Sequence, residues 1–183
     1  MYRPRLNKDE YELILSHREK TNTERQRHAV NKVLIPDTKV KVLLFDIETA
    51  PALSYVWDRW KQNITQDQIV DEGYMLCYCA RWLGDDVIMF DALPNHDLYA
   101  TDPENDYEVC KNLWTLLNEA DVIIGHNVDK FDKRVANTRF VYHGMQPPSP
   151  AKSVDTLKIA KGVFKLPYNR LDPLADHLGY ART

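Results

Sequence analysis

Two carboxylates lie two positions apart at the end of an apolar segment. Val40–Ile47 (VKVLLFDI) is a β-branched and apolar run of strand length. Asp46 lies near the end of this run, and Glu48 directly follows it. Because side chains alternate along a strand, both carboxylates share one face and Ile47 points into the core. Two unit charges about 4 Å apart repel by about 4 kcal/mol at an effective dielectric near 20, so such pairs commonly bind cations. Oxygen ligands suit Mg²⁺ or Mn²⁺ better than zinc. A solvent-facing strand end explains this pair equally well.

A third carboxylate is expected at a junction between a strand and a helix. The apolar run Val122–Ile124 ends at Gly125 and predicts a short buried strand. Phe131 and Asp132 then open a segment with helical spacing. This third acidic residue favours a metal site over a solvent-facing strand end.

With the third carboxylate, the chain resembles a known family. The segments FDIET (Phe45–Thr49) and GHNVDKFD (Gly125–Asp132) resemble the first and second acidic motifs of the DEDD superfamily of 3′-to-5′ exonucleases, which includes polymerase proofreading domains. The second segment is similar to the Asn-x-x-x-Phe-Asp form of family-B polymerases and their stand-alone relatives. Ser153–Ala160 (SVDTLKIA) resembles the strand–helix segment that follows, and the resemblance extends over residues 39–179.

The resemblance implies two-metal phosphodiester hydrolysis at the free 3′ end of a single-stranded nucleic acid, with DNA expected before RNA. Two Mg²⁺ or Mn²⁺ ions about 4 Å apart would orient the attacking water and stabilise the leaving oxygen. Asp46 would bridge both ions, Glu48 would bind the ion on the nucleophile side, and Asp132 would hold the second ion.

The resemblance also implies residues that contact the substrate. Thr49 and Ala50 would line the pocket for the terminal base, and Asn127 and Phe131 correspond to family residues near the terminal nucleotide. Physically, Phe131 on the apolar face of its helix is expected to be a core residue.

The family's fourth aspartate comes from a late helix that also carries the general base, either Tyr in a YxxxD motif or His. Tyr168 and Asp172 satisfy YxxxD, but Pro167 and Pro173 predict a loop and a helix start. Asp172 is then the N-cap, with Pro173 at the first helical position, and only a secondary candidate for a metal ligand. We expect the third motif to lie beyond Thr183, in a domain truncated at its C-terminus.

Other titratable residues have ordinary structural explanations. His126 beside the buried strand is expected to be a hydrogen-bonded packing residue, and Asp155 is expected to be structural. Asp176 and His177 are expected on the exposed face of the last helix.

The predicted elements give an α/β fold with a mixed sheet, in which three antiparallel strands are followed by parallel strands and flanked by helices. That order is typical of the ribonuclease-H-like fold. Further strands are expected at Tyr74–Leu83 and Val87–Leu93, and Ser153–Leu157 is expected to begin another strand or a strand–helix junction. Helices are expected at Val109–Ala120, Phe131–Tyr142 and Leu171–Leu178.

Composition and punctuation predict the domain organisation. Residues 1–37 are expected to form a short helix and a polar linker, and residues 38–183 the exonuclease domain. The three cysteines Cys77, Cys79 and Cys110 are expected to be buried reduced thiols. The sequence contains neither a secretion signal nor a membrane span, which predicts a cytoplasmic protein. A net charge of −3 gives no overall case for nucleic-acid binding and does not exclude it, because metal ions can neutralise phosphates locally.

Three functions remain open from the sequence. The first is the exonuclease, acting on single-stranded DNA or RNA 3′ ends, with a polymerase or another replication or repair protein as its partner and no membrane. The second is a weak or inactive nucleic-acid-binding module of the same fold, because the fourth carboxylate and the base are not identified. The third is an endonuclease or integrase, but these enzymes lack the Asn-x-x-x-Phe-Asp helix.

Overall fold

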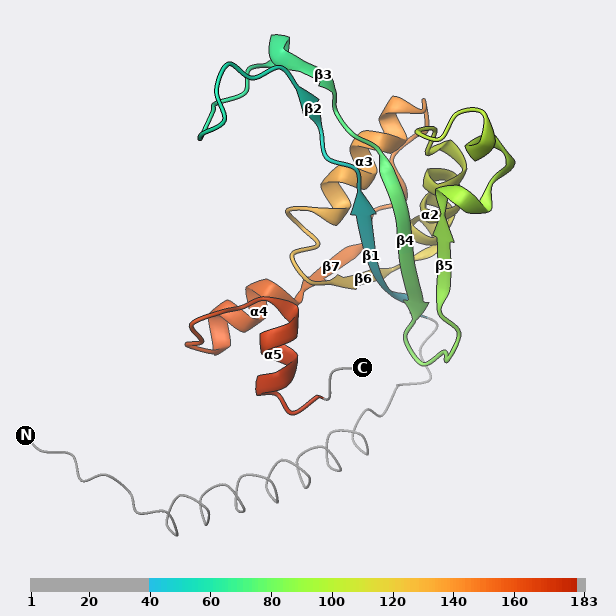
Figure 1. The fold of residues 1–183 in the computed structure, drawn as a ribbon. Helices are drawn as coiled ribbons and strands as arrows, with labels where there is room; N and C mark the ends of the chain where they lie inside the picture. Colours follow the sequence, from blue (N-terminus) through green and yellow to red (C-terminus); the bar gives the residue numbers. More distant parts are fainter. Residues whose placement is uncertain (1–39, 181–183) are drawn as a thin grey trace, which may run out of the picture. The chain divides into compact units, whose positions relative to one another are not determined.

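The computed structural model describes residues 40–180 (Figure 1). The helix and linker expected within residues 1–37 lie outside the described residues. The chain divides into two compact units, and the described parts are residues 40–166 of one and residues 167–180 of the other. We describe each unit by itself.

The first unit is built on a five-stranded sheet with the strand order β5-β4-β1-β6-β7. The strands are β1 (Val42–Thr49), β4 (Met75–Trp82), β5 (Met89–Ala92), β6 (Val122–Gly125) and β7 (Lys152–Asp155). Strand β4 pairs with β1 and β5 in antiparallel register, whereas β6 runs parallel to both β1 and β7. This mixed sheet confirms the expected ribonuclease-H-like order.

Helices connect the parallel strands. Helix α2 (Tyr107–Glu119) leads into β6, and α3 (Asp132–Tyr142) leads into β7. Helix α4 (Thr156–Val163) follows β7 directly, so the segment around Asp155 is a strand–helix junction. Short 3-10 helices, η2 (Leu93–Asn95) and η3 (Asp97–Ala100), connect β5 to α2.

One face of the sheet forms the hydrophobic core. The odd-numbered residues of β1, Leu43, Phe45 and Ile47, are buried together with Tyr78 and Ala80 of β4. Helix α2 covers them with buried residues at helical spacing (Val109, Cys110, Leu113 and Leu117), and α3 contributes Ala136 and Phe140. The alternate residues of β1 therefore point to the opposite face of the sheet.

A two-stranded ribbon that the sequence did not predict projects from this sheet. Strands β2 (Leu53–Ser54) and β3 (Ile69–Asp71) pair antiparallel, with the 3-10 helix η1 (Gln66–Gln68) before β3. In Figure 1 the ribbon extends away from the ends of β1 and β4. We call residues 53–71 the aromatic arm.

The second unit contains α5 (Leu171–His177). Its N-cap is Arg170, so the prediction of Asp172 as N-cap was wrong. Asp172 instead lies in the first helical turn, where a carboxylate interacts favourably with the helix dipole. Asp176 and His177 are exposed, as expected. Between Val40 and Tyr180, no helix has the length and apolar character that spanning a bilayer requires.

Candidate functional site

Strand β1 places two carboxylates on the face of the sheet opposite the core. Asp46 and Glu48 are exposed, whereas Phe45 and Ile47 beside them are only 5% and 3% exposed. Strand β4 brings Cys79 opposite Asp46 and Cys77 opposite Glu48. The expectation that all three cysteines are buried was therefore wrong for Cys79, which shares the exposed face of Asp46.

The thiol of Cys77 is held in its protonated form. Burial raises its pKa, and the neighbouring carboxylate of Glu48 adds to the rise. A protonated thiol is a poor metal ligand. On this face, the two carboxylates are therefore better candidates for metal ligands than Cys77.

The β6–α3 junction brings Asp132 to these carboxylates. Asp132 is the first residue of α3, is only 2% exposed, and accepts a hydrogen bond from the backbone N–H of Ile47 at 3.2 Å. Its carboxyl group lies close enough to that of Asp46 for the two to interact. Burial raises the pKa of Asp132 and the adjacent Asp46 adds to the rise, although hydrogen bonds from the backbone partly oppose it. A cation would relieve this cost by neutralising both carboxylates.

Gly125 permits the close approach of β6 to β1. A Cβ atom at this position would lie 2.8 Å from Cβ of Val128 and 3.1 Å from the carbonyl oxygen of Phe45. A larger residue would therefore push the loop before Asp132 away from β1.

The loop between Gly125 and α3 is fixed by Asp155. Asn127 adopts a left-handed backbone conformation with φ 68°, and its N–H donates to Oδ1 of Asp155 at 3.0 Å. The same oxygen accepts the N–H groups of Leu157 and Lys158 at the start of α4, at 3.0 and 3.3 Å. Asp155 therefore has the structural role that was expected. His126 is also hydrogen-bonded, with Nδ1 3.0 Å from Oγ1 of Thr156.

A cavity of about 410 Å³ is lined by three of the four predicted substrate-binding residues. Thr49, Ala50 and Phe131 line it, whereas Asn127 does not. The pairing register shifts between Glu48 and Thr49, so that Leu76 is an extra residue in β4 at the point where the chain enters the cavity wall. Bulges of this kind are frequent beside functional sites.

The expectation that Phe131 is a core residue was wrong. Phe131 is 42% exposed and serves as the N-cap of α3, while the buried face of the helix consists of Asp132, Ala136 and Phe140. Phe131, Val135, Thr138 and Tyr142 recur at helical spacing in the sequence, and all four line the cavity. Arg134, on the same wall, adds a positive charge.

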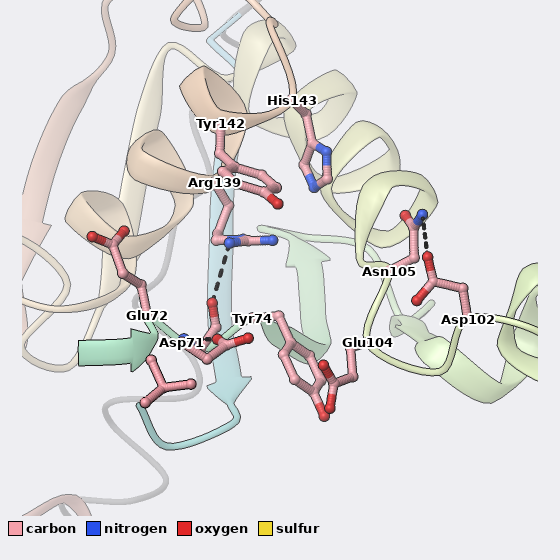
Figure 2. A pocket seen from close by; sticks show the side chains of 11 residues that line it. Asp71, Glu72, Tyr74, Asp102, Glu104, Asn105, Arg139, Tyr142 and His143 are labelled. Carbon is pink, nitrogen blue, oxygen red and sulfur yellow. Dashed lines mark hydrogen bonds between the residues drawn. The ribbon is translucent and has the colours of Figure 1, made fainter. Parts of the chain in front are cut away.

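A second pocket of about 390 Å³ lies beside the first and shares several residues with it. Figure 2 shows Arg139, Tyr142 and His143 across from the carboxylates of Asp102 and Glu104. The guanidinium of Arg139 lies 4.2 Å from the centre of the Tyr142 ring and donates to the carbonyl oxygen of Gly73 at 3.1 Å.

Asp106 forms a buried polar network behind this pocket. Arg139 donates to both of its oxygens at 2.8 and 2.7 Å, Nε2 of His143 lies 2.6 Å from Oδ1, and the N–H of Met75 donates at 2.7 Å. Burial acts to raise the pKa of Asp106, but these hydrogen bonds outweigh it, so the pKa is lowered. No local sequence pattern predicts these pairings, because they join segments far apart in the chain.

Asp106, Cys110 and His143 form a buried group that could hold a metal ion of unknown identity. Their ligand atoms all lie within 4.8 Å of one another, a limit that Asp46, Glu48 and Asp132 do not meet as a set in the described chain. However, Arg139 occupies both oxygens of Asp106, and burial raises the pKa of the Cys110 thiol. A structural ion pair therefore explains this group better. Two-metal sites do not require all three carboxylates to meet, since only the bridging residue contacts both ions.

Comparison with known proteins gives a structural likeness without a sequence match. No protein-family model matches the chain, and no curated protein matches it. The chain is similar to the family B DNA polymerase from the hyperthermophilic archaeon Pyrobaculum calidifontis, with a TM-score of 0.55 and 16% sequence identity. The fold is ribonuclease-H-like. The likeness covers 78% of this chain but only 18% of the polymerase, and at this identity it establishes the fold alone.

The second unit contains the remaining candidates. Asp172 is exposed in the first turn of α5, and Tyr168 before it is 68% exposed. Both side chains therefore lie at the surface of this unit.

Proposed function

We propose that this chain is a metal-dependent 3′-to-5′ exonuclease acting on single-stranded nucleic acid. The contact between Asp132 and Asp46 carries the proposal, because burial and like charge make this pair costly without a cation. The resemblance of FDIET and GHNVDKFD to the DEDD motifs supports the same conclusion. The structural likeness to part of a family B DNA polymerase favours DNA over RNA.

The residues present fit two Mg²⁺ or Mn²⁺ ions, which would act as Lewis acids and lower the pKa of a bound water. Asp46, Glu48 and Asp132 would hold the ions. Glu48 would also help to orient the water. Asp172 has less support as a fourth ligand, with Tyr168 as the base, because it rests on the YxxxD spacing alone.

The cavity beside β1 supports binding of the terminal nucleotide. Thr49 and Ala50 lie immediately after Glu48, so a base in the cavity would place its phosphate near the carboxylates. Phe131 exposes its ring in the same cavity, where an unstacked base could pack against it. Arg134 would offset the charge of the phosphate. A polymerase or another replication or repair protein is the partner class that this activity fits.

The test is cleavage of a 5′-labelled single-stranded DNA in Mn²⁺. We expect a ladder of products shortened from the 3′ end, release of nucleoside monophosphates, and no cleavage of circular DNA. Asp46→Asn and Asp132→Asn should each reduce the rate by about 100-fold or more. Asp97→Asn, an exposed carboxylate in η3, is the control and should leave the rate unchanged.

Two results would reject the proposal. Cleavage of circular DNA at the rate of linear DNA would indicate an endonuclease. Metal-independent binding without any cleavage would indicate a nucleic-acid-binding module of the same fold.

A further inference from the structure

The aromatic arm exposes an unusual amount of aromatic surface. Trp57 is 94% exposed, Trp60 80% and Tyr55 73%. Each of these residue types buries about 150–250 Å² when it is covered, so three of them exposed within six residues offer a large surface to a binding partner.

The base of the arm has a defined structure. The N–H of Tyr55 donates to the carbonyl oxygen of Gln68 at 2.8 Å, and Nε2 of Gln68 donates back to the carbonyl oxygen of Tyr55 at 3.0 Å. Together with the β2–β3 pairing, these bonds position the segment that carries Trp57 and Trp60. The two tryptophans are therefore presented by a paired ribbon.

Both ends of the arm continue into the cavity proposed for the terminal nucleotide. Residues Thr49–Ala52 line the cavity directly before β2, and Glu72–Tyr74 line it directly after β3. The N–H of Ala50 donates to the carbonyl oxygen of Tyr74 at 2.9 Å and joins the two ends. A strand that leaves the cavity thus has the arm as its neighbour, and Figure 1 shows the arm extending outward from this point.

The residues around the tryptophans fit a nucleic-acid strand better than a protein surface. In Trp57–Lys61 the rings are separated by charged residues, two of them basic (Arg59 and Lys61) and one acidic (Asp58). The two other carboxylates of the arm, Asp67 and Asp71, lie outside this segment, in η1 and β3. This segment provides rings for bases and cations for phosphates, and the exposed aliphatic side chains of the arm, Leu53, Val56, Ile64 and Val70, lie outside it. Single-strand-binding proteins combine stacking rings and positive charge in this way.

We propose that the aromatic arm is a stacking platform for the bases on the 5′ side of the terminal nucleotide. The inference rests on the proposed exonuclease function and extends it: the preferred substrate is a single strand long enough to reach from the cavity to Trp57 and Trp60. The arm binds without regard to base sequence, because every base presents a flat face.

The test is a binding comparison in EDTA, which prevents cleavage of the oligonucleotide. The affinity of the full chain for a 12-nucleotide single-stranded DNA should fall roughly 5- to 150-fold for each of Trp57→Ala and Trp60→Ala. Trp57→Phe and Trp60→Phe are the matched controls and should retain most of the affinity, since an aromatic ring remains. Circular dichroism would verify that the variants fold.

An oligonucleotide with abasic sites behind its 3′-terminal nucleotide makes the test specific for stacking. The wild-type chain should bind it more weakly than the normal strand, whereas the Trp57→Ala/Trp60→Ala variant should bind both strands alike. The arm inference would be overturned if the abasic strand weakened binding equally in both proteins, or if the Trp57→Ala/Trp60→Ala variant kept the wild-type affinity for DNA. Cleavage of linear DNA separates the two proposals. If the wild type cleaves from 3′ ends and the Trp variants keep its DNA affinity, only the stacking role of the arm is refuted. A wild type that neither binds nor cleaves refutes both.

Discussion

Asp132 lies against Asp46, and its Oδ1 also accepts the N–H of Ile47, the residue between the two β1 carboxylates. A single buried side chain therefore links the start of α3 to the acidic end of β1. Burial and the proximity of Asp46 make its charged form unfavourable without a cation.

The first prediction concerns the charge of Asp132. Because the pKa of Asp132 is raised in the folded chain, the folded state holds this proton more tightly than the unfolded state. In the absence of metal, its contribution to stability should be greatest below the unfolded pKa and should be lost as the pH rises through the folded pKa. At pH 7 in EDTA, Asp132→Asn should therefore raise Tm by a few degrees, measured by calorimetry.

Metal titration supplies the control for this prediction. Added Mn²⁺ should raise the Tm of the wild type but should have much less effect on Asp132→Asn. A wild-type Tm that is independent of Mn²⁺ would argue against a metal ion at this pair.

The second prediction concerns the Asp106–Arg139 ion pair. Asp106→Ala leaves the buried guanidinium of Arg139 without its partner, which should reduce the free energy of unfolding by about 3–5 kcal/mol. Glu108→Ala breaks the more exposed pair with Lys111 and should have a much smaller effect. Urea denaturation of the two variants makes the comparison.

The pH dependence of Asp106 has the opposite sign to that of Asp132. Its pKa is lowered on folding, so its stabilising effect is present above the unfolded pKa and is lost as the pH falls through the folded pKa. Asp106→Asn should therefore flatten the acid limb of the stability curve. If the acid limb were unchanged in Asp106→Asn, Asp106 would not be the source of this pH dependence.

The third prediction separates the two phenylalanines of α3. Phe140 is fully buried, so Phe140→Ala should reduce the free energy of unfolding by about 3–5 kcal/mol. Phe131→Ala removes a largely exposed ring from the cavity wall and should change stability by less than about 1 kcal/mol. Its expected effect is a raised KM for the oligonucleotide. A large loss of stability in Phe131→Ala would instead indicate that Phe131 packs in the core.

The fourth prediction uses two glycines. Gly125→Ala forces a Cβ atom against Val128 and Phe45 and should cost about 1–3 kcal/mol, with a loss of metal affinity as Asp132 moves. Gly162→Ala in α4 meets nothing within 4 Å and should stabilise the chain by about 0.5–1 kcal/mol. A neutral Gly125→Ala would show that the β1–β6 contact has room to adjust.

The strands of the main sheet could be predicted because each is a continuous run of β-branched or apolar residues. Val122–Gly125 and Met75–Trp82 lie where periodicity placed strands, and the alternation around Asp46 was confirmed. The burial of α3 was misread, since its true core face begins with Asp132, a charged residue that a hydrophobic pattern excludes.

Two features depended on contacts that the sequence does not encode locally. The strands of the aromatic arm are only two and three residues long, so their pairing leaves no usable periodicity. The network of Asp106 joins α2, β4 and the end of α3, and only the folded chain brings these segments together. The roles of Asp46, Glu48 and Asp132 remain predictions.

Asp155 uses one oxygen to accept three backbone N–H groups, from Asn127 and from the first turn of α4. The loop that precedes Asp132 and the helix that follows β7 consequently share Asp155 as an anchor. They should open as one cooperative unit in hydrogen exchange, so that disturbance of α4 reaches the acidic site through the backbone.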